Sequence, residues 1–183
     1  LCLRLKENES TSMNTSLTIR SANADDLDAI LSLFDTARRL MAANGNPSQW
    51  DEGYPNADIA RADIAQGNCY VCTPAERQTI VGTFVFILGE EPTYRLIEQG
   101  HWHADRPYGT IHRMASDGHT HGIALATFDY CAARTDYLRI DTHADNRPML
   151  RAITRYGFRP CGIIYVRDGS PRLAFDLERP ATH

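Results

Sequence analysis

The chain has 183 residues, a formal net charge of −4, 43% hydrophobic and 23% charged residues. This length and composition suit one compact globular domain with a single hydrophobic core. The negative balance argues against general nucleic-acid binding, which needs a basic face. Lys6 is the only lysine, which excludes a lysine nucleophile or Schiff base from the body of the domain. No apolar run approaches the roughly 20 residues of a membrane helix, so we expect no membrane association.

The chain begins with polar and charged residues that lack the hydrophobic stretch of a secretory signal. We therefore expect a flexible extension over residues 1–16, a single domain over 17–178 and a short tail over 179–183. Within the domain, the alternating segment Leu17–Arg20 predicts a first strand.

Two helices are predicted to follow the first strand. Asn23 is a suitable cap for the first, whose apolar stripe runs from Leu27 to Met41 and stops at Asn44–Gly45. A loop then leads to a second helix over Asn56–Gln66.

Strand-like runs come next, at Cys69–Cys72 and Thr79–Leu88. The second run is almost wholly apolar, which is typical of a strand buried on both faces. A polar excursion, residues 90–106, separates it from the C-terminal half.

The five cysteines are odd in number and scattered along the chain. Cys69 and Cys72 have CxxC spacing, but positions three apart on a strand point to opposite faces. A redox pair prefers a turn that leads into a helix. We therefore predict reduced, buried cysteines, as in a cytoplasmic protein.

The most informative segment is the strand Tyr108–Met114 with the turn and helix that follow it. The turn carries Gly118 and Gly122 and opens directly into a helix over Ile123–Arg134. The first N–H groups of a helix have no partner within it, and the helix dipole adds partial positive charge. Because glycine lets an anion approach the backbone, this segment predicts a phosphate site.

The remaining elements complete an α/β pattern. A strand over Tyr137–His143 precedes Asp145–Asn146, which caps a helix ending at Tyr156, and a final hairpin joins residues 163–166 and 172–177. The order β-α-α-β-β-β-α-β-α-β-β predicts a mixed sheet with helices on both faces.

This arrangement resembles the GCN5-related N-acetyltransferase (GNAT) family, which binds acetyl-CoA. The family's pyrophosphate loop reads Arg or Gln, two residues, Gly, one residue, then Gly or Ala; His119, Gly122 and Ala124 stand at these positions. Asn146 matches an Asn that contacts the pantetheine arm of the cofactor, and Gly157–Phe158 match the close of the helix. The resemblance implies a set of cofactor-binding residues: Met114, Ala115, His119, Thr120, His121, Gly122, Ile123, Ala124 and Asn146.

Three points in this resemblance are open. The loop replaces the leading Arg or Gln with His119, and the glycines also fit an ordinary strand-to-helix turn. Asn146 also fits a plain helix cap. The Tyr that serves many family members as general acid would fall at Ile153, so no catalytic Tyr is carried over.

The resemblance implies that the amine attacks the thioester directly while a main-chain N–H, that of Met114, polarises the carbonyl group. His143 is the predicted base, because an imidazole shuttles protons at neutral pH and this residue ends the strand beside the cofactor. Asp141, two residues earlier on the same strand face, is predicted to orient it or to bind a cationic amine. Asp141 and His143 alternatively satisfy backbone groups in a tight corner. His112 is the weaker alternative base.

Trp50 and Tyr54, in the loop after the first helix, are predicted to wall an acceptor pocket together with His112. The alternative for the two aromatics is that they pin a long loop to the body of the protein. The acidic segment Glu90–Tyr94 would add negative charge for an amine. Four histidines in loops have no fixed third ligand, so we predict no metal site: His101, His103, His119 and His121.

The sequence thus predicts an acetyl-CoA-dependent acetyltransferase acting on a small-molecule or amino-acid-like amine. The alternative, which the missing Tyr and the His in the loop favour, is a non-catalytic acyl-CoA-binding module. The oligomeric state, a homodimer included, is left open.

Overall fold

A computed structural model of the protein describes residues 16–51 and 53–179. The predicted N-terminal extension up to residue 15 and the predicted tail from residue 180 lie outside the described residues.

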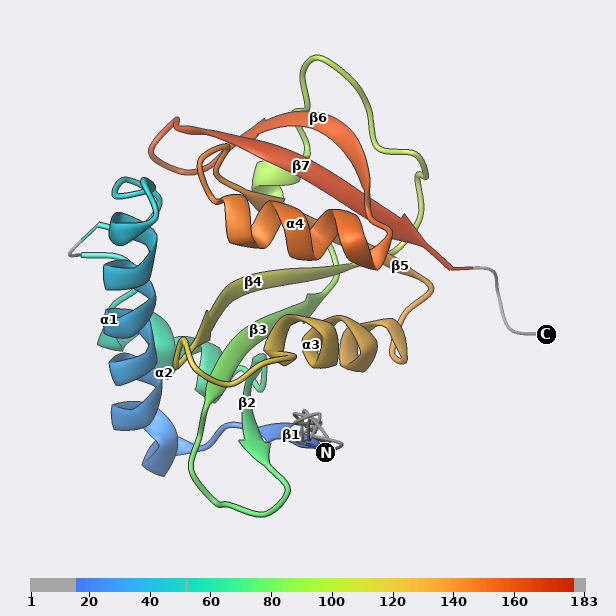
Figure 1. The fold of residues 1–183 in the computed structure, drawn as a ribbon. Coiled ribbons are helices and arrows are strands. Elements are labelled where there is room, and N and C mark those ends of the chain that lie inside the picture. The colour runs from blue at the N-terminus through green and yellow to red at the C-terminus, as the bar shows by residue number, and fades with distance from the viewer. Residues whose placement is uncertain (1–15, 52, 180–183) are drawn as a thin grey trace, which may run out of the picture.

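Seven strands form one mixed sheet in the order β1-β2-β3-β4-β5-β7-β6 (Figure 1). Neighbouring strands are antiparallel except for β4 and β5, which run parallel at the centre of the order. The strands are β1 (Leu17–Ser21), β2 (Cys69–Pro74), β3 (Gly82–Leu88), β4 (Gly109–Ser116), β5 (Tyr137–Thr142), β6 (Arg159–Tyr165) and β7 (Pro171–Glu178).

The helices cover both faces of this sheet, which confirms the predicted architecture. On one face lie α1 (Leu27–Ala43) and α2 (Ala57–Ala65), and on the other α3 (Ile123–Ala132) and α4 (Arg147–Tyr156). The structure also contains two short 3-10 helices, η1 (Ala24–Asp26) and η2 (Pro92–Tyr94). Asn23 caps η1, whose last residue leads directly into α1.

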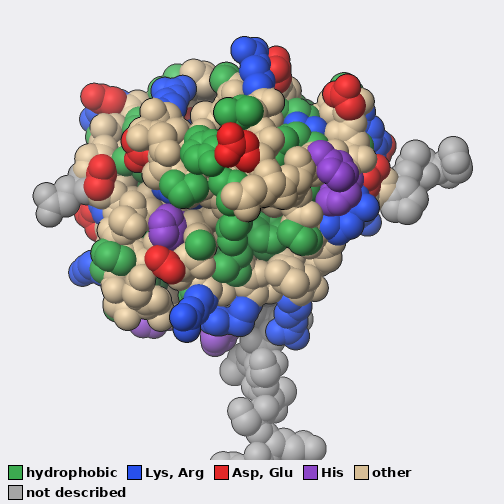
Figure 2. Space-filling model, turned by 90° about the horizontal axis from the view of Figure 1, so that it is seen from above, with side chains coloured by type: hydrophobic (Ala, Val, Ile, Leu, Met, Phe, Trp, Pro, Cys, Tyr) green, Lys and Arg blue, Asp and Glu red, His purple; other side chains and the backbone are tan. Residues whose placement is uncertain are grey.

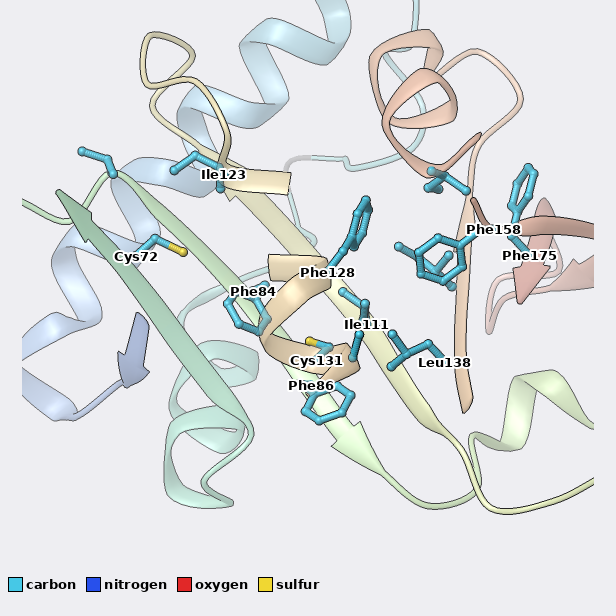
Figure 3. Close-up of a cluster of buried hydrophobic side chains, with 14 residues drawn as sticks. Cys72, Phe84, Phe86, Ile111, Ile123, Phe128, Cys131, Leu138, Phe158 and Phe175 are labelled. Atoms are coloured by element: carbon cyan, nitrogen blue, oxygen red, sulfur yellow. The ribbon is translucent and has the colours of Figure 1, made fainter. Parts of the chain in front are cut away.

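Aromatic and aliphatic side chains from β3, β4 and β5 pack against α3 and α4 in the larger core cluster (Figure 3). Phe84, Ile111, Phe128 and Leu138 are each at most 2% exposed. Cys72 belongs to this cluster, whereas Cys69 belongs to the cluster under α1 and α2 on the opposite face. The CxxC pair is therefore split across the sheet, as predicted, and both thiols are free.

Several elements differ from the predicted bounds by two or three residues, such as β3, which begins at Gly82 rather than Thr79, and two elements differ more. β6 begins at Arg159 rather than at residue 163, because its first two residues are exposed on an edge strand and give no apolar pattern. η2 lies within the excursion predicted to be irregular, where Glu91 accepts a hydrogen bond from the Thr93 N–H and caps its first turn. This turn fixes two side chains, those of Glu91 and Tyr94, against the sheet.

Candidate active site

The two parallel strands at the centre of the sheet part midway along their length. β4 and β5 pair from Gly109 opposite Leu138 to Ile111 opposite Ile140, and neither strand pairs with the other beyond that point. Since hydrogen bonds no longer join them, the sheet opens between the C-terminal ends of β4 and β5 (Figure 1). The carboxyl ends of parallel strands are where α/β proteins bind ligands.

A β-bulge in β4 lies directly beside this opening. The register with β3 shifts so that both Arg113 and Met114 oppose Phe84. Arg113 has a φ of +47°, a strained conformation for a residue with a side chain. Its guanidinium makes two hydrogen bonds to the buried Asp63 carboxylate, at 2.7 and 2.8 Å. This bidentate ion pair ties the bulge to α2 and holds it in place.

A cleft of about 360 Å³ runs from the end of α1 across β4 to the first turns of α3 and α4. The structure brings five of the nine predicted cofactor residues together in its lining: Met114, Ala115, Ile123, Ala124 and Asn146. The other four form the turn between Gly118 and Ile123, two residues that also line the cleft.

The N-terminus of α3 has the geometry of an anion site. Gly122 is its N-cap and has a φ of +86°, which favours glycine. No hydrogen-bond acceptor among the described residues takes the main-chain N–H groups of residues 121–124. Four donors therefore remain for a ligand at the mouth of the cleft.

One predicted donor of this loop is not free. The Thr120 N–H and hydroxyl both donate to the Asp117 carboxylate, at 2.8 Å each, and the His119 N–H donates to it at 2.9 Å. The prediction that the Thr120 N–H serves the phosphate is therefore wrong for this structure. Burial raises the pKa of Asp117, but the hydrogen bonds from Thr120 and His119 outweigh it and leave the pKa below its ordinary value.

Asn146 is a helix cap, as the alternative interpretation had it. Its Oδ1 accepts a hydrogen bond from the Met149 N–H at 3.2 Å, and its Nδ2 donates to Gln49 at 2.8 Å. The predicted contact with the cofactor stays a prediction, and one donor position of the amide is already engaged.

Replacing Asn146 with alanine is expected to lower the free energy of unfolding by about 1 kcal/mol, the typical cost of a lost cap. We also expect weaker CoA binding, because Asn146 lines the cleft. Asn56→Ala is the matched control, since Asn56 caps α2 through the Ile59 N–H at 3.0 Å and lies outside the cleft lining. Denaturant titration and calorimetry with CoA check both effects. If the two variants lose stability alike and neither loses CoA affinity, Asn146 is a cap only.

The predicted pairing of Asp141 with His143 is wrong. The Asp141 carboxylate accepts a hydrogen bond from the Tyr94 hydroxyl at 2.7 Å. His143 lies just past β5 and its Nδ1 accepts from the Asp145 N–H at 3.1 Å. The excursion over residues 90–106 folds onto Asp141, which the local strand pattern could not show.

A compact group of ionisable side chains lies at the point where β4 and β5 part. His112 Nε2 is 3.1 Å from Glu91 Oε2, and the rings of His112 and Tyr94 are 6.1 Å apart. The hydrogen bond from His112 lowers the pKa of Glu91 to about 2, although burial acts in the opposite direction. Burial, and then the charge of Asp141, raise the pKa of Tyr94 well above its ordinary value.

The two predicted acceptor aromatics have different surroundings. Trp50 is 8% exposed and packs edge-on against Phe34, so the alternative of a loop anchor describes it. Tyr54 is 37% exposed, and its hydroxyl accepts a hydrogen bond from Arg113 at the bulge. A role for Tyr54 toward an acceptor stays a prediction.

The residue in place of the family's catalytic Tyr is fully buried: Ile153 has no exposed surface. The hydroxyl of the nearby Tyr156 donates to Asp129 of α3 at 2.7 Å. Neither residue takes over the missing acid.

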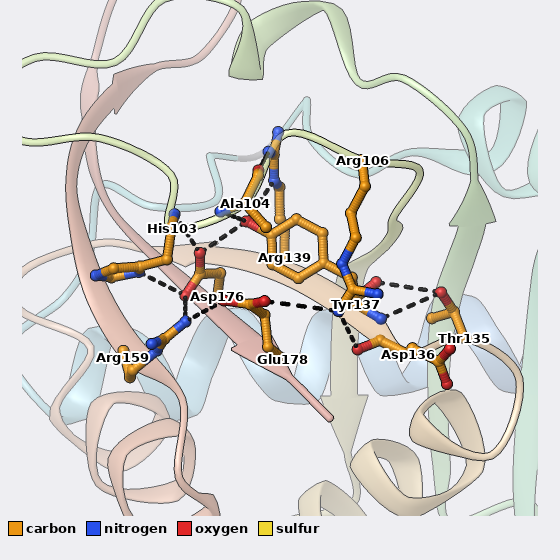
Figure 4. Close-up of polar contacts among 10 residues, drawn as sticks. All are labelled: His103, Ala104, Arg106, Thr135, Asp136, Tyr137, Arg139, Arg159, Asp176 and Glu178. Carbon is orange, nitrogen blue, oxygen red and sulfur yellow. Dashed lines mark hydrogen bonds and ion pairs between the residues drawn. The ribbon is translucent and has the colours of Figure 1, made fainter. Parts of the chain in front are cut away.

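A second polar network lies away from the cleft (Figure 4). The fully buried Asp176 carboxylate accepts hydrogen bonds from the His103 N–H and the Tyr137 hydroxyl, at 2.8 and 2.7 Å, and lies 2.8 Å from His103 Nδ1. Possible metal-binding atoms of His103, Cys161 and Asp176 lie within 4.8 Å of one another. These contacts already satisfy the carboxylate and attach the 97–106 loop to β7.

The face of the molecule seen from above in Figure 1 carries hydrophobic side chains in its middle and charged side chains of both signs around them (Figure 2). No basic patch dominates this face. None of the helices in residues 16–51 and 53–179 has the length and hydropathy of a membrane span.

Comparison with solved structures places the chain among the acyl-CoA acetyltransferase folds. A GNAT-family acetyltransferase from Streptococcus agalactiae 2603 is 30% identical, with a TM-score of 0.79 over 90% of this chain and 96% of that one. A GNAT-family acetyltransferase from Listeria monocytogenes 4b F2365 is 18% identical, with a TM-score of 0.63 over 88% and 94%. The NatC complex, solved with a Gag peptide and CoA, shares the fold at 14% identity, with a TM-score of 0.55 over 90% and 99%.

No protein-family model and no curated protein sequence matches the chain. The fold, the divided central strands and the cleft at the start of α3 define the acetyltransferase class. Within that class, the chain belongs to the GNAT family.

Proposed function

We propose that this protein transfers an acetyl group from acetyl-CoA to the amine of a small-molecule or amino-acid-like acceptor. The observation that carries the proposal is the cleft at the parting of β4 and β5, with four main-chain N–H donors at its mouth. We expect it to act in the cytoplasm without nucleic acid, membrane or metal.

The residues of the cleft fit acetyl-CoA. The N–H groups of residues 121–124 would hold the pyrophosphate, and the apolar stretch formed by Met114, Ile123 and Met149 would flank the pantetheine arm. Acetyl-CoA supplies the acetyl group as an activated thioester. The Met114 N–H, in the bulge, is the proposed donor to the thioester carbonyl.

His112 is the base that the geometry favours. Because the pKa of Glu91 is lowered to about 2, its carboxylate is ionised and can only accept hydrogen bonds. His112 Nε2 must therefore be the donor in this contact. In a neutral ring this leaves Nδ1 with a free lone pair for a proton of the acceptor amine. Glu91 would then stabilise the imidazolium that forms, as the carboxylate does in a Ser-His-Asp triad.

His143 has the opposite arrangement. Its Nδ1 accepts a main-chain N–H, so the proton of the neutral ring sits on Nε2. That nitrogen is a donor, and a residue in this state is poorly suited to removing a proton.

The charge around His112 supports a cationic acceptor. Ile111 and Ile140 pack in the core under α3 and α4, so the next residues along each strand, His112 and Asp141, face the other side of the sheet. Glu91 contacts His112 there, and electrostatic complementarity of the two carboxylates favours a positively charged partner. An amino group that is protonated in solution meets this requirement.

The test is a steady-state assay of free CoA release with a panel of small amines and amino acids, next to calorimetry with CoA. We expect CoA binding and turnover with at least one cationic amine. If CoA binds but no amine in the panel is acetylated, the alternative of a non-catalytic acyl-CoA-binding module takes precedence. If CoA does not bind, the cofactor assignment is wrong.

A further inference from the structure

Three amide side chains link the loop after α1 to the start of α4. Gln49 Oε1 accepts hydrogen bonds from Asn46 Nδ2 at 2.7 Å and from Asn146 Nδ2 at 2.8 Å. Gln49 and Asn146 are 97 positions apart in the sequence, so this bridge fixes the loop against a distant element. Asn46 and Asn146 both line the cleft.

The contacts determine which way each amide points. The Met149 N–H requires the oxygen of Asn146, so the nitrogen of Asn146 faces Gln49. Gln49 must then present its oxygen, which in turn requires the nitrogen of Asn46. The nitrogen of the Asn46 amide therefore faces Gln49, and its oxygen Oδ1 faces away from Gln49.

This oxygen has no partner. Asn46 is 1% exposed, and its Oδ1 is buried without a hydrogen bond to any described residue. The other such atoms in the described chain are threonine hydroxyls, none of which lines the cleft. A buried amide oxygen without a donor carries a free-energy penalty. Solvent does not reach this oxygen in this structure, so a ligand that parts the side chains around it and brings a donor would remove that penalty.

We infer that Asn46 Oδ1 accepts a hydrogen bond from an amide N–H of the pantetheine arm, and that Gln49 is the positioning residue that holds Asn46 for it. This inference rests on the proposed function. Apart from one hydroxyl group, the hydrogen-bond donors of the pantetheine arm are its amide N–H groups. Asn46 lines the cleft that we propose as the cofactor site. The acceptor amine is the other source of an N–H, but His112, Glu91 and Tyr54 lie outside this lining.

Asn46→Leu keeps the size of the side chain and removes both polar ends. Calorimetry with CoA and with ADP separates the arm from the pyrophosphate, since both ligands carry the pyrophosphate and only CoA carries the arm. We expect the affinity for CoA to fall about tenfold and that for ADP to stay unchanged. The melting temperature of the ligand-free protein should stay the same or rise, because a buried polar atom without a partner has been removed.

Gln49 offers a matched pair of variants. Gln49→Leu removes the acceptor of both hydrogen bonds and should weaken CoA binding as Asn46→Leu does. Gln49→Glu keeps carboxylate oxygens in the accepting position and should restore the affinity for CoA. In steady-state kinetics we expect KM for acetyl-CoA to rise in Gln49→Leu while KM for the amine stays unchanged.

Several results would overturn the inference. Unchanged CoA affinity in Asn46→Leu would mean that Oδ1 binds only water. An equal loss for ADP would place the contact at the phosphates or in the fold. A rise in KM for the amine with CoA affinity intact would assign the N–H to the acceptor. If the wild-type protein binds neither CoA nor ADP, the proposed function fails together with this inference. A loss of CoA binding in the variants alone contradicts neither.

Discussion

Substitution of Gly122 by valine is expected to abolish CoA binding while the protein stays folded. Gly122 has a φ of +86° at the N-cap of α3, where a β-branched residue is strained. A side chain there would also stand beside the N–H groups that we assign to the pyrophosphate. Charge-assisted hydrogen bonds contribute roughly 1.5–3 kcal/mol each, so losing two of them would lower the affinity by about 100-fold or more.

The space around Gly122 makes this a clean experiment. Apart from its chain neighbours and the adjoining helix backbone, a Cβ at this position would have no protein atom within 4 Å, so it would not press on a distant part of the molecule. Gly169→Val is the control: Gly169 has a φ of +82°, equally open surroundings and a place between β6 and β7. We expect both variants to lose similar stability and only Gly122→Val to lose CoA binding by calorimetry. Wild-type affinity in Gly122→Val would remove the phosphate assignment.

The local signals in the sequence were sufficient for the fold. The alternation at Leu17–Arg20, the apolar run ending at Leu88 and the glycine turn before Ile123 each depend on neighbours in the chain. The structure places a strand or helix at each of them. The same local logic identified Asn146 as a cap.

The candidate site depends on contacts that no local pattern contains. Glu91 and His112 are 21 positions apart, and Tyr94 and Asp141 are 47 apart. The negative charge of the segment around Glu91 indicated a role toward an amine. Nothing in the sequence showed where residues 90–106 would pack. Asp141 and His143 share a strand face, so pairing them was reasonable locally, but long-range packing gave each a different partner.

The engagement of Thr120 by Asp117 has a different cause. An Asp before a turn often binds the N–H groups that follow it, so this competition was available from the sequence. The interpretation of the loop as a phosphate site assigned those N–H groups to the ligand. The structure divides the loop into donors held by Asp117 and donors left at the start of α3.

Loss of the His112 imidazole is expected to produce the largest effect on turnover. If His112 removes the proton of the amine, His112→Ala should lower kcat by roughly 100-fold or more, the usual contribution of a positioned base. The affinity for CoA should stay nearly unchanged, because His112 lies outside the cleft lining. Glu91→Gln should lower kcat less, since the amide oxygen can still accept from Nε2 while the charge that stabilises the imidazolium is lost.

His143→Ala distinguishes the two candidate bases in the same assay. Turnover should be slow in His112→Ala and close to the wild-type rate in His143→Ala, because the Nδ1 of His143 is occupied by a main-chain N–H. The reverse result, with slow turnover in His143→Ala and wild-type turnover in His112→Ala, would return the role to His143. Its Nδ1 would then have to exchange the Asp145 N–H for the proton of the amine during the reaction, and Asp145→Pro, which removes that N–H, should accelerate rather than slow the transfer.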